Sequence, residues 1–369
     1  MATRIEEPLA RTEAAPADDP RALALVDCDV HPYVNNIHEL TPYLPQRWRS
    51  WIDQTGYQGP PPPVYPKVFE LASRRDAWPP SGKRPGGDPG FAAKQLLDEW
   101  SVDLAILNNL YGLGGIKNHH LAREITPALN RWLQDHWLDA DERWRGALCV
   151  NPEDPDGAPA VIEEFARDER FVQVLLPVRS SAPYGRPQFR PIFRAAADAG
   201  LPVGLHFGGS AANPITAVGW PSFYIEDHTA MSQAFEAQVL SLVCEGVFDE
   251  IPESRVILIE GGFGWLPPLM WRLDKNYRGL RDEVPWLDDL PSRYIRRHFR
   301  ATSQPMEEPE DPEHLRWLFE MIGEDGFVMF ATDYPHWDFD SPDRALPHTL
   351  PEELRRRILA GNAQATYGF

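Results

Sequence analysis

The sequence is poor in cysteine and lacks long apolar runs, and both absences exclude classes of protein. Its three cysteines, Cys28, Cys149 and Cys244, are widely separated in apolar contexts. They predict neither a disulfide framework nor a thiolate zinc cluster, and we expect all three to be buried packing residues. No stretch approaches the eighteen apolar residues of a membrane span, and the N-terminus lacks the apolar centre of a signal peptide, so we expect a cytoplasmic protein.

Basic residues are also scarce relative to acidic ones. There are 36 Lys and Arg against 55 Asp and Glu, which gives a net charge of −19. Such a chain repels nucleic acids and anionic membranes, so neither is expected as a partner. Residues 1–21 are rich in Ala, Pro, Asp and Glu without an apolar period, and we expect a flexible leader there. Residues 22–369 are then expected to form the folded domain.

The apolar residues that are present fall into eight short runs with amphipathic stretches between them. The runs cover residues 23–31, 102–109, 145–151, 171–178, 201–207, 255–262, 297–304 and 326–336. The expected helices cover residues 91–100, 120–142, 157–167, 188–199, 229–250, 264–278, 311–322 and 351–361. Eight alternating strand and helix units predict an α/β fold, a (β/α)8 TIM-like barrel.

One segment breaks this rhythm. Residues 56–90 are rich in proline and glycine and cannot form a long regular element. They fall between the first strand and its helix, which in a barrel places them on the catalytic rim. This Pro/Gly-rich insertion could be a lid or a subunit contact, or a surface excursion without function.

Polar side chains recur at the C-terminal ends of the predicted strands, where barrel enzymes build their active sites. They are Asp29 and His31 from the first run, His206 from the fifth, Glu260 from the sixth and Asp333 from the eighth. Asp29 and His31 share one face of a strand because they are two residues apart. Asp27 shares that face but lies deeper, so Asp29 is the better candidate ligand and Asp27 could be a supporting carboxylate.

A divalent cation would account for two imidazoles and two carboxylates at buried strand ends. Asp29, His31, His206 and Asp333 together suit Zn²⁺, with Mn²⁺ or Fe²⁺ possible. The competing interpretation is a hydrogen-bonded network of core acids and histidines without a metal.

Five segments, in order, carry a resemblance to a known family. They are "DCDVHP", "VGLHFGG", "RVILIEGGFGWLPPLMWRLD", "ATDYPHWD" and "ILAGNAQATYGF". The chain resembles the metal-dependent amidohydrolase superfamily, in the branch of aminocarboxymuconate-semialdehyde and 2,6-dihydroxybenzoate decarboxylases. The resemblance implies a TIM-like barrel and one divalent metal held by Asp29, His31, His206 and Asp333. It also implies a small carboxylic acid substrate and a possible homodimer.

The sequence departs from that family at the end of the sixth strand. Many members have a histidine there that assists the chemistry, but this chain has Glu260. His228 could supply the missing imidazole, or it could be an ordinary residue at a helix start, with Asp227 as N-cap. His336 and Trp337 are expected to shape the pocket or brace the ligands. The fourth strand has no lysine that could bridge two metals, so a single metal is predicted.

Two reactions fit the same predicted site. In a decarboxylase, the metal anchors the substrate and Asp333 protonates carbon, with His228 and Glu260 as further catalytic candidates. In the alternative, a hydrolase or hydratase, the metal activates water. We favour decarboxylation of an aromatic or unsaturated carboxylic acid on the resemblance, and rank a non-enzyme last. Aromatic residues that would suit a flat substrate are Tyr111, Trp220, Phe223, Tyr224, Trp265 and Trp337.

Overall fold

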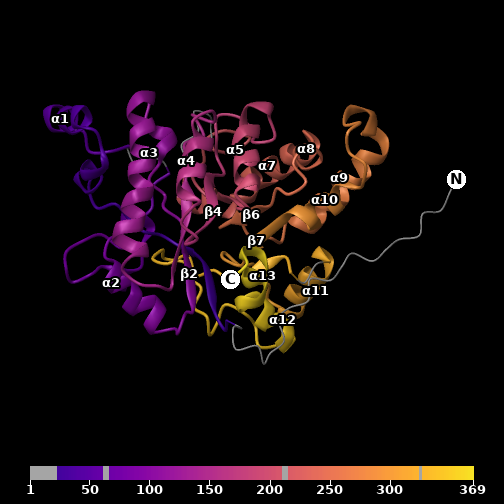
Figure 1. The fold of residues 1–369 in the computed structure, drawn as a ribbon. Helices are drawn as coiled ribbons and strands as arrows, with labels where there is room; N and C mark the ends of the chain where they lie inside the picture. Colours follow the sequence, from indigo (N-terminus) through magenta and orange to yellow (C-terminus); the bar gives the residue numbers. More distant parts are fainter. Residues whose placement is uncertain (1–22, 61–65, 210–214, 324–325) are drawn as a thin grey trace.

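The protein is described by a computed structural model that places residues 23–60, 66–209, 215–323 and 326–369. Eight parallel strands form one sheet in sequence order (Figure 1). They are β1 (Val26–Val30), β2 (Leu104–Leu107), β3 (Trp144–Cys149), β4 (Phe171–Pro177), β5 (Val203–His206), β6 (Val256–Ile259), β7 (Phe299–Thr302) and β8 (Val328–Met329). Each lies inside a predicted run, including the charged seventh, except that β3 begins one residue before its run.

The sheet closes between its first and last strands. The Cys28 amide donates to the Phe330 carbonyl at 2.9 Å, and the His31 amide donates to the Tyr334 carbonyl at 2.8 Å. These bonds join the ends of β1 and β8, so the predicted (β/α)8 barrel is confirmed. They also bring the segment after β1 beside the segment after β8, although about 300 residues separate them in the sequence.

Helices surround the strands, with α1 and the α9 and α10 pair at opposite sides of Figure 1. Their bounds are α1 Gln46–Thr55, α2 Pro89–Ala92, α3 His119–Leu133, α4 Ala158–Phe165, α5 Arg190–Asp198, α6 Tyr224–Thr229, α7 Ser232–Cys244, α8 Val247–Glu250, α9 Leu266–Leu280, α10 Pro291–His298, α11 Pro312–Ile322, α12 Glu352–Arg356 and α13 Asn362–Tyr367. Helices α1, α10 and α13 were not predicted from the sequence, and α6 overlaps a predicted helix only at Thr229.

The single helix predicted over residues 229–250 is wrong. Gly246 adopts a φ of 71° between α7 and α8, a left-handed conformation that ends a helix. His228 lies within the separate short helix α6, and Asp227 is not an N-cap. Asp227 is instead buried in an ion pair, its Oδ1 atom 2.5 Å from a guanidinium nitrogen of Arg179.

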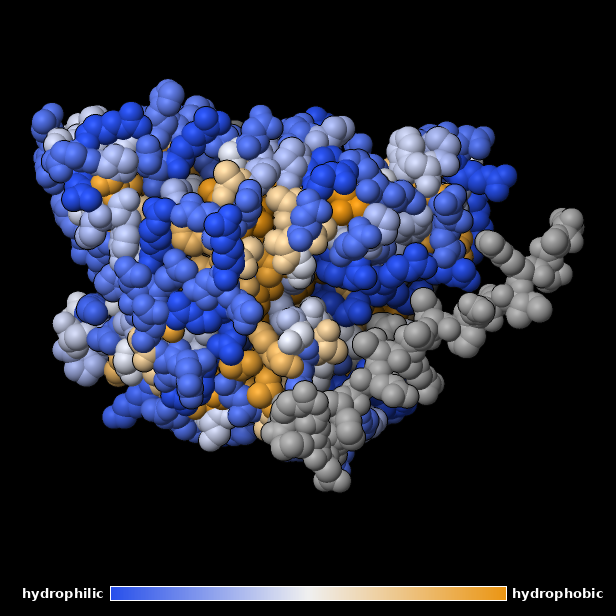
Figure 2. Space-filling model, viewed as in Figure 1, coloured by the Kyte–Doolittle hydropathy of each residue, from blue (hydrophilic) through white to orange (hydrophobic). Residues whose placement is uncertain are grey.

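Apolar side chains from the strands and the facing sides of the helices form the core. The surface in Figure 2 is largely hydrophilic, and apolar residues show mainly in a central strip between the helices. Cys28 and Cys149 are buried as expected, but Cys244, at the end of α7, is only partly buried, which corrects that prediction. Among the described residues, no helix is both long and apolar enough to cross a membrane.

The part of the insertion from residue 66 onward packs against the barrel rim. The Trp337 amide donates to the Ala72 carbonyl at 2.7 Å, and the Arg74 amide donates to the Pro335 carbonyl at 2.9 Å. On its other side, the Tyr33 amide donates to the Gly86 carbonyl at 2.7 Å. The insertion therefore braces both segments that leave the strand ends carrying candidate ligands.

Gly86 gives a direct test of this bracing. It adopts a φ of 72°, and a Cβ atom built there would lie 2.2 Å from the backbone oxygen of His31. We expect Gly86→Ala to displace the His31 segment and to cost about 2 kcal/mol of stability, since neither the clash nor the left-handed backbone is easily relieved. The midpoint temperature of thermal unfolding and the affinity for Mn²⁺ should both fall. Gly82→Ala is the matched control, because Gly82 also has a positive φ but has open space around it.

Candidate metal centre

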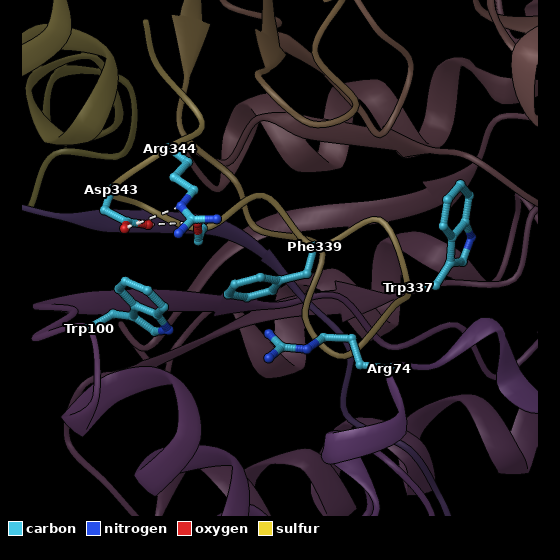
Figure 3. Close-up of a pocket in the computed structure, with 7 residues that line it drawn as sticks. Arg74, Trp100, Trp337, Phe339, Asp343 and Arg344 are labelled. Atoms are coloured by element: carbon cyan, nitrogen blue, oxygen red, sulfur yellow. Dashed lines mark hydrogen bonds and ion pairs between the residues drawn. The ribbon is translucent and has the colours of Figure 1, made fainter. Parts of the chain in front are cut away.

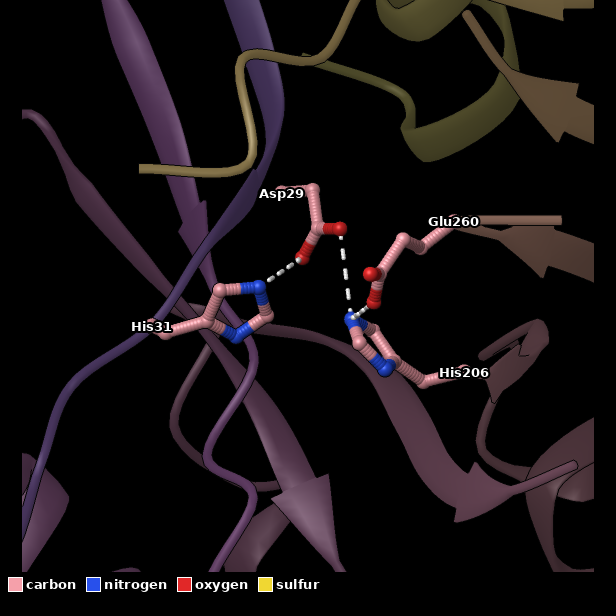
Figure 4. Close-up of side chains that lie close together, drawn as sticks. All are labelled: Asp29, His31, His206 and Glu260. Atoms are coloured by element: carbon pink, nitrogen blue, oxygen red, sulfur yellow. Dashed lines mark hydrogen bonds and ion pairs between the residues drawn. The ribbon is translucent and has the colours of Figure 1, made fainter. Parts of the chain in front are cut away.

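Four ionisable side chains from three strand ends converge inside the mouth of the barrel (Figure 4). Asp29 is the penultimate residue of β1, His31 follows that strand, His206 ends β5 and Glu260 follows β6. Each offers one ligand atom, and these atoms all lie within 4.8 Å of one another. All four residues are buried.

Asp29 lies between the two imidazoles. Its Oδ1 atom is 3.3 Å from His31 Nε2, and its Oδ2 atom is 3.2 Å from His206 Nε2. The other ring nitrogens face backbone oxygens, with His31 Nδ1 2.9 Å from the Asn108 oxygen and His206 Nδ1 2.6 Å from the Phe207 oxygen. With the Nδ1 protons on the backbone side, the neutral rings would present both Nε2 lone pairs to the shared space, as metal-binding histidines require.

Asp333 joins the group from the end of β8. It is fully buried and adopts a φ of 62°, a conformation uncommon for aspartate. Its Oδ1 atom lies 2.7 Å from His31 Nε2 and 2.8 Å from His336 Nδ1, whereas Oδ2 has no hydrogen-bond partner among the described residues. Burial alone would raise the pKa of Asp333, but the His336 and His31 imidazoles lower it below its ordinary value.

Asp27 holds the turn that carries Asp333. Its fully buried carboxylate accepts the Thr332 amide at 3.0 Å, the Thr332 hydroxyl at 2.5 Å and the Asp29 amide at 3.1 Å. Burial raises the pKa of Asp27 to about 7. Asp27 thus links the ends of β1 and β8 and does not face the imidazoles, which agrees with the choice of Asp29 as the candidate ligand.

The donor set fits a divalent cation. Asp29, Glu260 and Asp333 are buried carboxylates, and among the described residues no Lys or Arg lies within ion-pair distance of any of them. Burial and the neighbouring Asp333 and Asp29 raise the pKa of Glu260 well above its usual range. A buried cation would offset this repulsion. The site therefore has the chemistry of a single divalent metal centre.

His228 lies at the edge of this group, where it contacts aromatic side chains. Its Nε2 atom is 3.1 Å from Asp338 Oδ2 and 3.8 Å from Glu260 Oε1. Its ring lies 5.5 Å from the rings of both Tyr224 and Trp337. Trp265 instead donates to the Gly261 and Gly262 carbonyls behind Glu260. Of the aromatic residues expected at the site, Tyr224 and Trp337 are the two that contact His228.

The sequence analysis did not identify three polar residues next to the candidate ligands and His228, namely Asn108, Gln173 and Asp338. Asn108, at the end of β2, donates to Asp29 Oδ1 at 2.9 Å and accepts from Gln173 Nε2 at 2.7 Å. The Tyr367 hydroxyl donates to Gln173 Oε1 at 2.9 Å, so this buried chain reaches α13. Asp338 accepts from Gln304 Nε2 at 2.8 Å. Asn108 follows the same strand-end rule as the candidate ligands and could have been found by it.

A separate surface pocket of about 360 Å³ lies beside the loop after β8 (Figure 3). Its lining includes Arg74, Trp100, Trp337, Phe339 and Arg344. The Arg74 guanidinium lies 4.2 Å from the centre of the Phe339 ring and pairs with Asp76 at 2.6 Å. Trp337 is the one lining residue that also contacts the His228 ring, and we place the reaction at the metal centre because the ionisable groups converge there.

A barrel with a carboxylate and histidine metal centre at the C-terminal ends of its strands has the architecture of a metal-dependent barrel enzyme. The model of the amidohydrolase family matches residues 26–369, and the chain belongs to this family. The predicted superfamily is therefore confirmed.

Two curated relatives are gamma-resorcylate decarboxylases. That of Rhodococcus jostii is 26% identical over 262 residues, covering 65% of this chain and 75% of the relative. That of a Rhizobium species is 24% identical over 293 residues, covering 74% and 85%. A dihydroxybenzoic acid decarboxylase from a Polaromonas species, solved with manganese and the inhibitor 2-nitroresorcinol, has a TM-score of 0.67 at 20% identity and covers 94% of this chain and 97% of its own. The names of these relatives agree with the decarboxylase prediction.

Proposed function

We propose that this chain is a mononuclear metal-dependent decarboxylase that removes CO2 from an aromatic carboxylic acid without an oxidant. The observation that carries this proposal is the meeting of Asp29, His31 and His206 from β1 and β5, joined through His31 by Asp333 from the segment after β8, with one oxygen of Asp333 unpartnered. The relatives named above are decarboxylases of hydroxylated aromatic acids, and this class of substrate is transferred from them.

Asp29, His31, His206 and Asp333 would hold the metal. The sequence favoured Zn²⁺, but the buried carboxylates around two imidazoles also suit Mn²⁺, the ion bound in the Polaromonas relative. When bound, a divalent metal acts as a Lewis acid toward the substrate carboxylate and an adjacent oxygen.

The protein's own task is to deliver a proton to carbon. Asp333 Oδ2 would donate it to the ring carbon that carries the carboxylate. The bond between that carbon and the carboxylate then breaks, and the carboxylate leaves as CO2. His336 Nδ1, 2.8 Å from the other oxygen of Asp333, is placed to return a proton, and its side chain is 18% exposed. The reaction thus consumes one proton and needs no oxidant.

The aromatic surroundings of His228 would hold a flat substrate. Tyr224 and Trp337 provide ring faces, and the imidazole, 3.1 Å from Asp338, is placed to bind a substrate oxygen. His228 is therefore proposed as a substrate-contacting residue beside the metal.

The test is a panel of hydroxylated benzoic acids incubated with Mn²⁺-loaded and Zn²⁺-loaded protein, with CO2 release and the aromatic product measured together. Matching amounts of CO2 and decarboxylated product from at least one acid are expected. Amides and esters of the same acids form the comparison set. A hydrolysed product without CO2 would contradict the proposal and support the hydrolase alternative.

A further inference from the structure

Glu260 occupies the strand end at which the chain departs from its family, and its backbone is held in an unusual conformation. It adopts a φ of 55°, and among the described non-glycine residues only Leu71, Ala72, Ser101 and Asp333 also have positive φ. Of these, Glu260 and Asp333 follow barrel strands and carry carboxylates into the site. Strained backbone of this kind persists where the surroundings fix it, and it clusters at functional sites.

The surroundings of Glu260 fix its turn from three directions. Its amide donates to Thr302 Oγ1 at 3.1 Å. The indole nitrogen of Trp265 donates to the Gly261 carbonyl at 2.9 Å and to the Gly262 carbonyl at 3.1 Å. A Cβ atom at Gly261 would lie 2.9 Å from the Phe235 ring, so the turn has no room for another side chain. The carboxylate of Glu260 is therefore presented by a rigid support.

The carboxylate points at the histidine nitrogens. Oε2 lies 3.4 Å from His206 Nε2 (Figure 4). Oε1 lies 3.8 Å from His228 Nε2. Glu260 also belongs to the four-residue group whose ligand atoms lie within 4.8 Å of one another. Asp333 instead belongs to a second group with His31 and His336, in which Oδ1 is hydrogen-bonded to both imidazoles. Glu260 thus shares the space between Asp29 and His206 that a cation would fill.

We propose that Glu260 is a direct ligand of the metal, and that it takes this position in place of the strand-six histidine of its family. The inference rests on the proposed metal-dependent function. It changes the expected role of Glu260 from catalytic candidate to metal ligand and leaves His228 as the imidazole that faces the substrate. It also makes the centre richer in carboxylate oxygen, which shifts its relative preference from Zn²⁺ toward Mn²⁺.

The experiment measures metal binding without substrate. Mn²⁺ and Zn²⁺ dissociation constants are determined by competition with a chromophoric chelator for the wild-type protein and for Glu260→Gln, Glu260→His and Glu308→Gln. Glu308 is exposed in the loop after β7, so Glu308→Gln makes the same chemical change outside the centre. Water-proton relaxation of the Mn²⁺ complexes counts the exchangeable waters on the bound ion, and circular dichroism of the metal-free variants confirms folding.

Glu260→Gln is expected to weaken Mn²⁺ binding by about 30-fold or more and to add one exchangeable water, while Glu308→Gln stays within about twofold of wild type. Glu260→His is expected to keep a metal but to raise the preference for Zn²⁺ over Mn²⁺ by about tenfold. A folded Glu260→Gln protein with wild-type Mn²⁺ affinity and water count would overturn the assignment. If the metal results are as expected but no acid yields CO2, the proposed reaction fails and the ligand assignment stands.

Discussion

Removal of the divalent metal is expected to abolish CO2 release, and addition of Mn²⁺ is expected to restore it. Asp29, His31 and His206 are buried in one group, and Asp333 joins them through its contact with His31, so a chelated protein loses the metal that would orient the substrate there. Lewis acid stabilisation is worth several kcal/mol, and each 1.4 kcal/mol is tenfold in rate, so turnover should fall by about a thousandfold or more. Dialysis against a chelator, metal analysis and CO2 assay before and after reconstitution check this result. Full turnover by metal-free protein would contradict the proposed function.

Metal binding is also expected to release protons at neutral pH. Burial alone would lower the pKa of His31, but Asp29 and Asp333 outweigh it and raise the pKa to about 9 in the metal-free chain. A metal binds the neutral imidazole, so below pH 9 it must displace this proton. Apparent affinity should therefore rise about tenfold per pH unit from pH 7 toward 9 and then level off. Calorimetry in buffers of different ionisation enthalpy counts the protons, and a count of zero at pH 7 would show that His31 does not bind the ion.

The periodicity of the sequence was sufficient to predict the barrel because parallel strands buried on both faces are short apolar runs. It was also sufficient to single out Asp29, His206 and Asp333, which interrupt such runs at their ends and prove to be buried. A charged residue within a run was weak evidence against a strand, since Arg300 lies in β7 without disturbing it. Polar residues at strand ends indicate a site because the C-terminal ends of all eight strands meet at one rim.

The remaining parts of the site depend on contacts between distant segments, which no local pattern encodes. The role of Asp27 follows from the pairing of β1 with β8, which places Thr332 against its carboxylate. Asp227 was expected to cap a helix next to it in the sequence, but it forms an ion pair with the distant Arg179. Both cases involve polar residues whose partners lie about 50 to 300 residues away, so their identity required the folded structure.

Asp333→Asn is expected to reduce kcat by about a thousandfold, the contribution typical of a positioned acid or base. Asparagine keeps the shape of the side chain, but it cannot carry the proton that carbon must receive, and it gives the metal a neutral oxygen in place of a charged one. No neighbouring side chain can take over the role of Asp333, because the left-handed turn directs this one side chain between His31 and His336.

Asp343→Asn provides the matched control, since Asp343 is exposed in the same loop and bonds to Ser341, outside the metal centre. The variants are compared in kcat, KM and metal content at saturating Mn²⁺. An Asp333→Asn protein that keeps its metal but has lost turnover assigns Asp333 to proton delivery, whereas one that regains turnover only at high Mn²⁺ assigns it mainly to metal binding. Because Oδ1 is engaged by two imidazoles while Oδ2 is unpartnered, we expect loss of turnover to exceed loss of metal affinity. A variant with its metal and full turnover would show that Asp333 has no catalytic role.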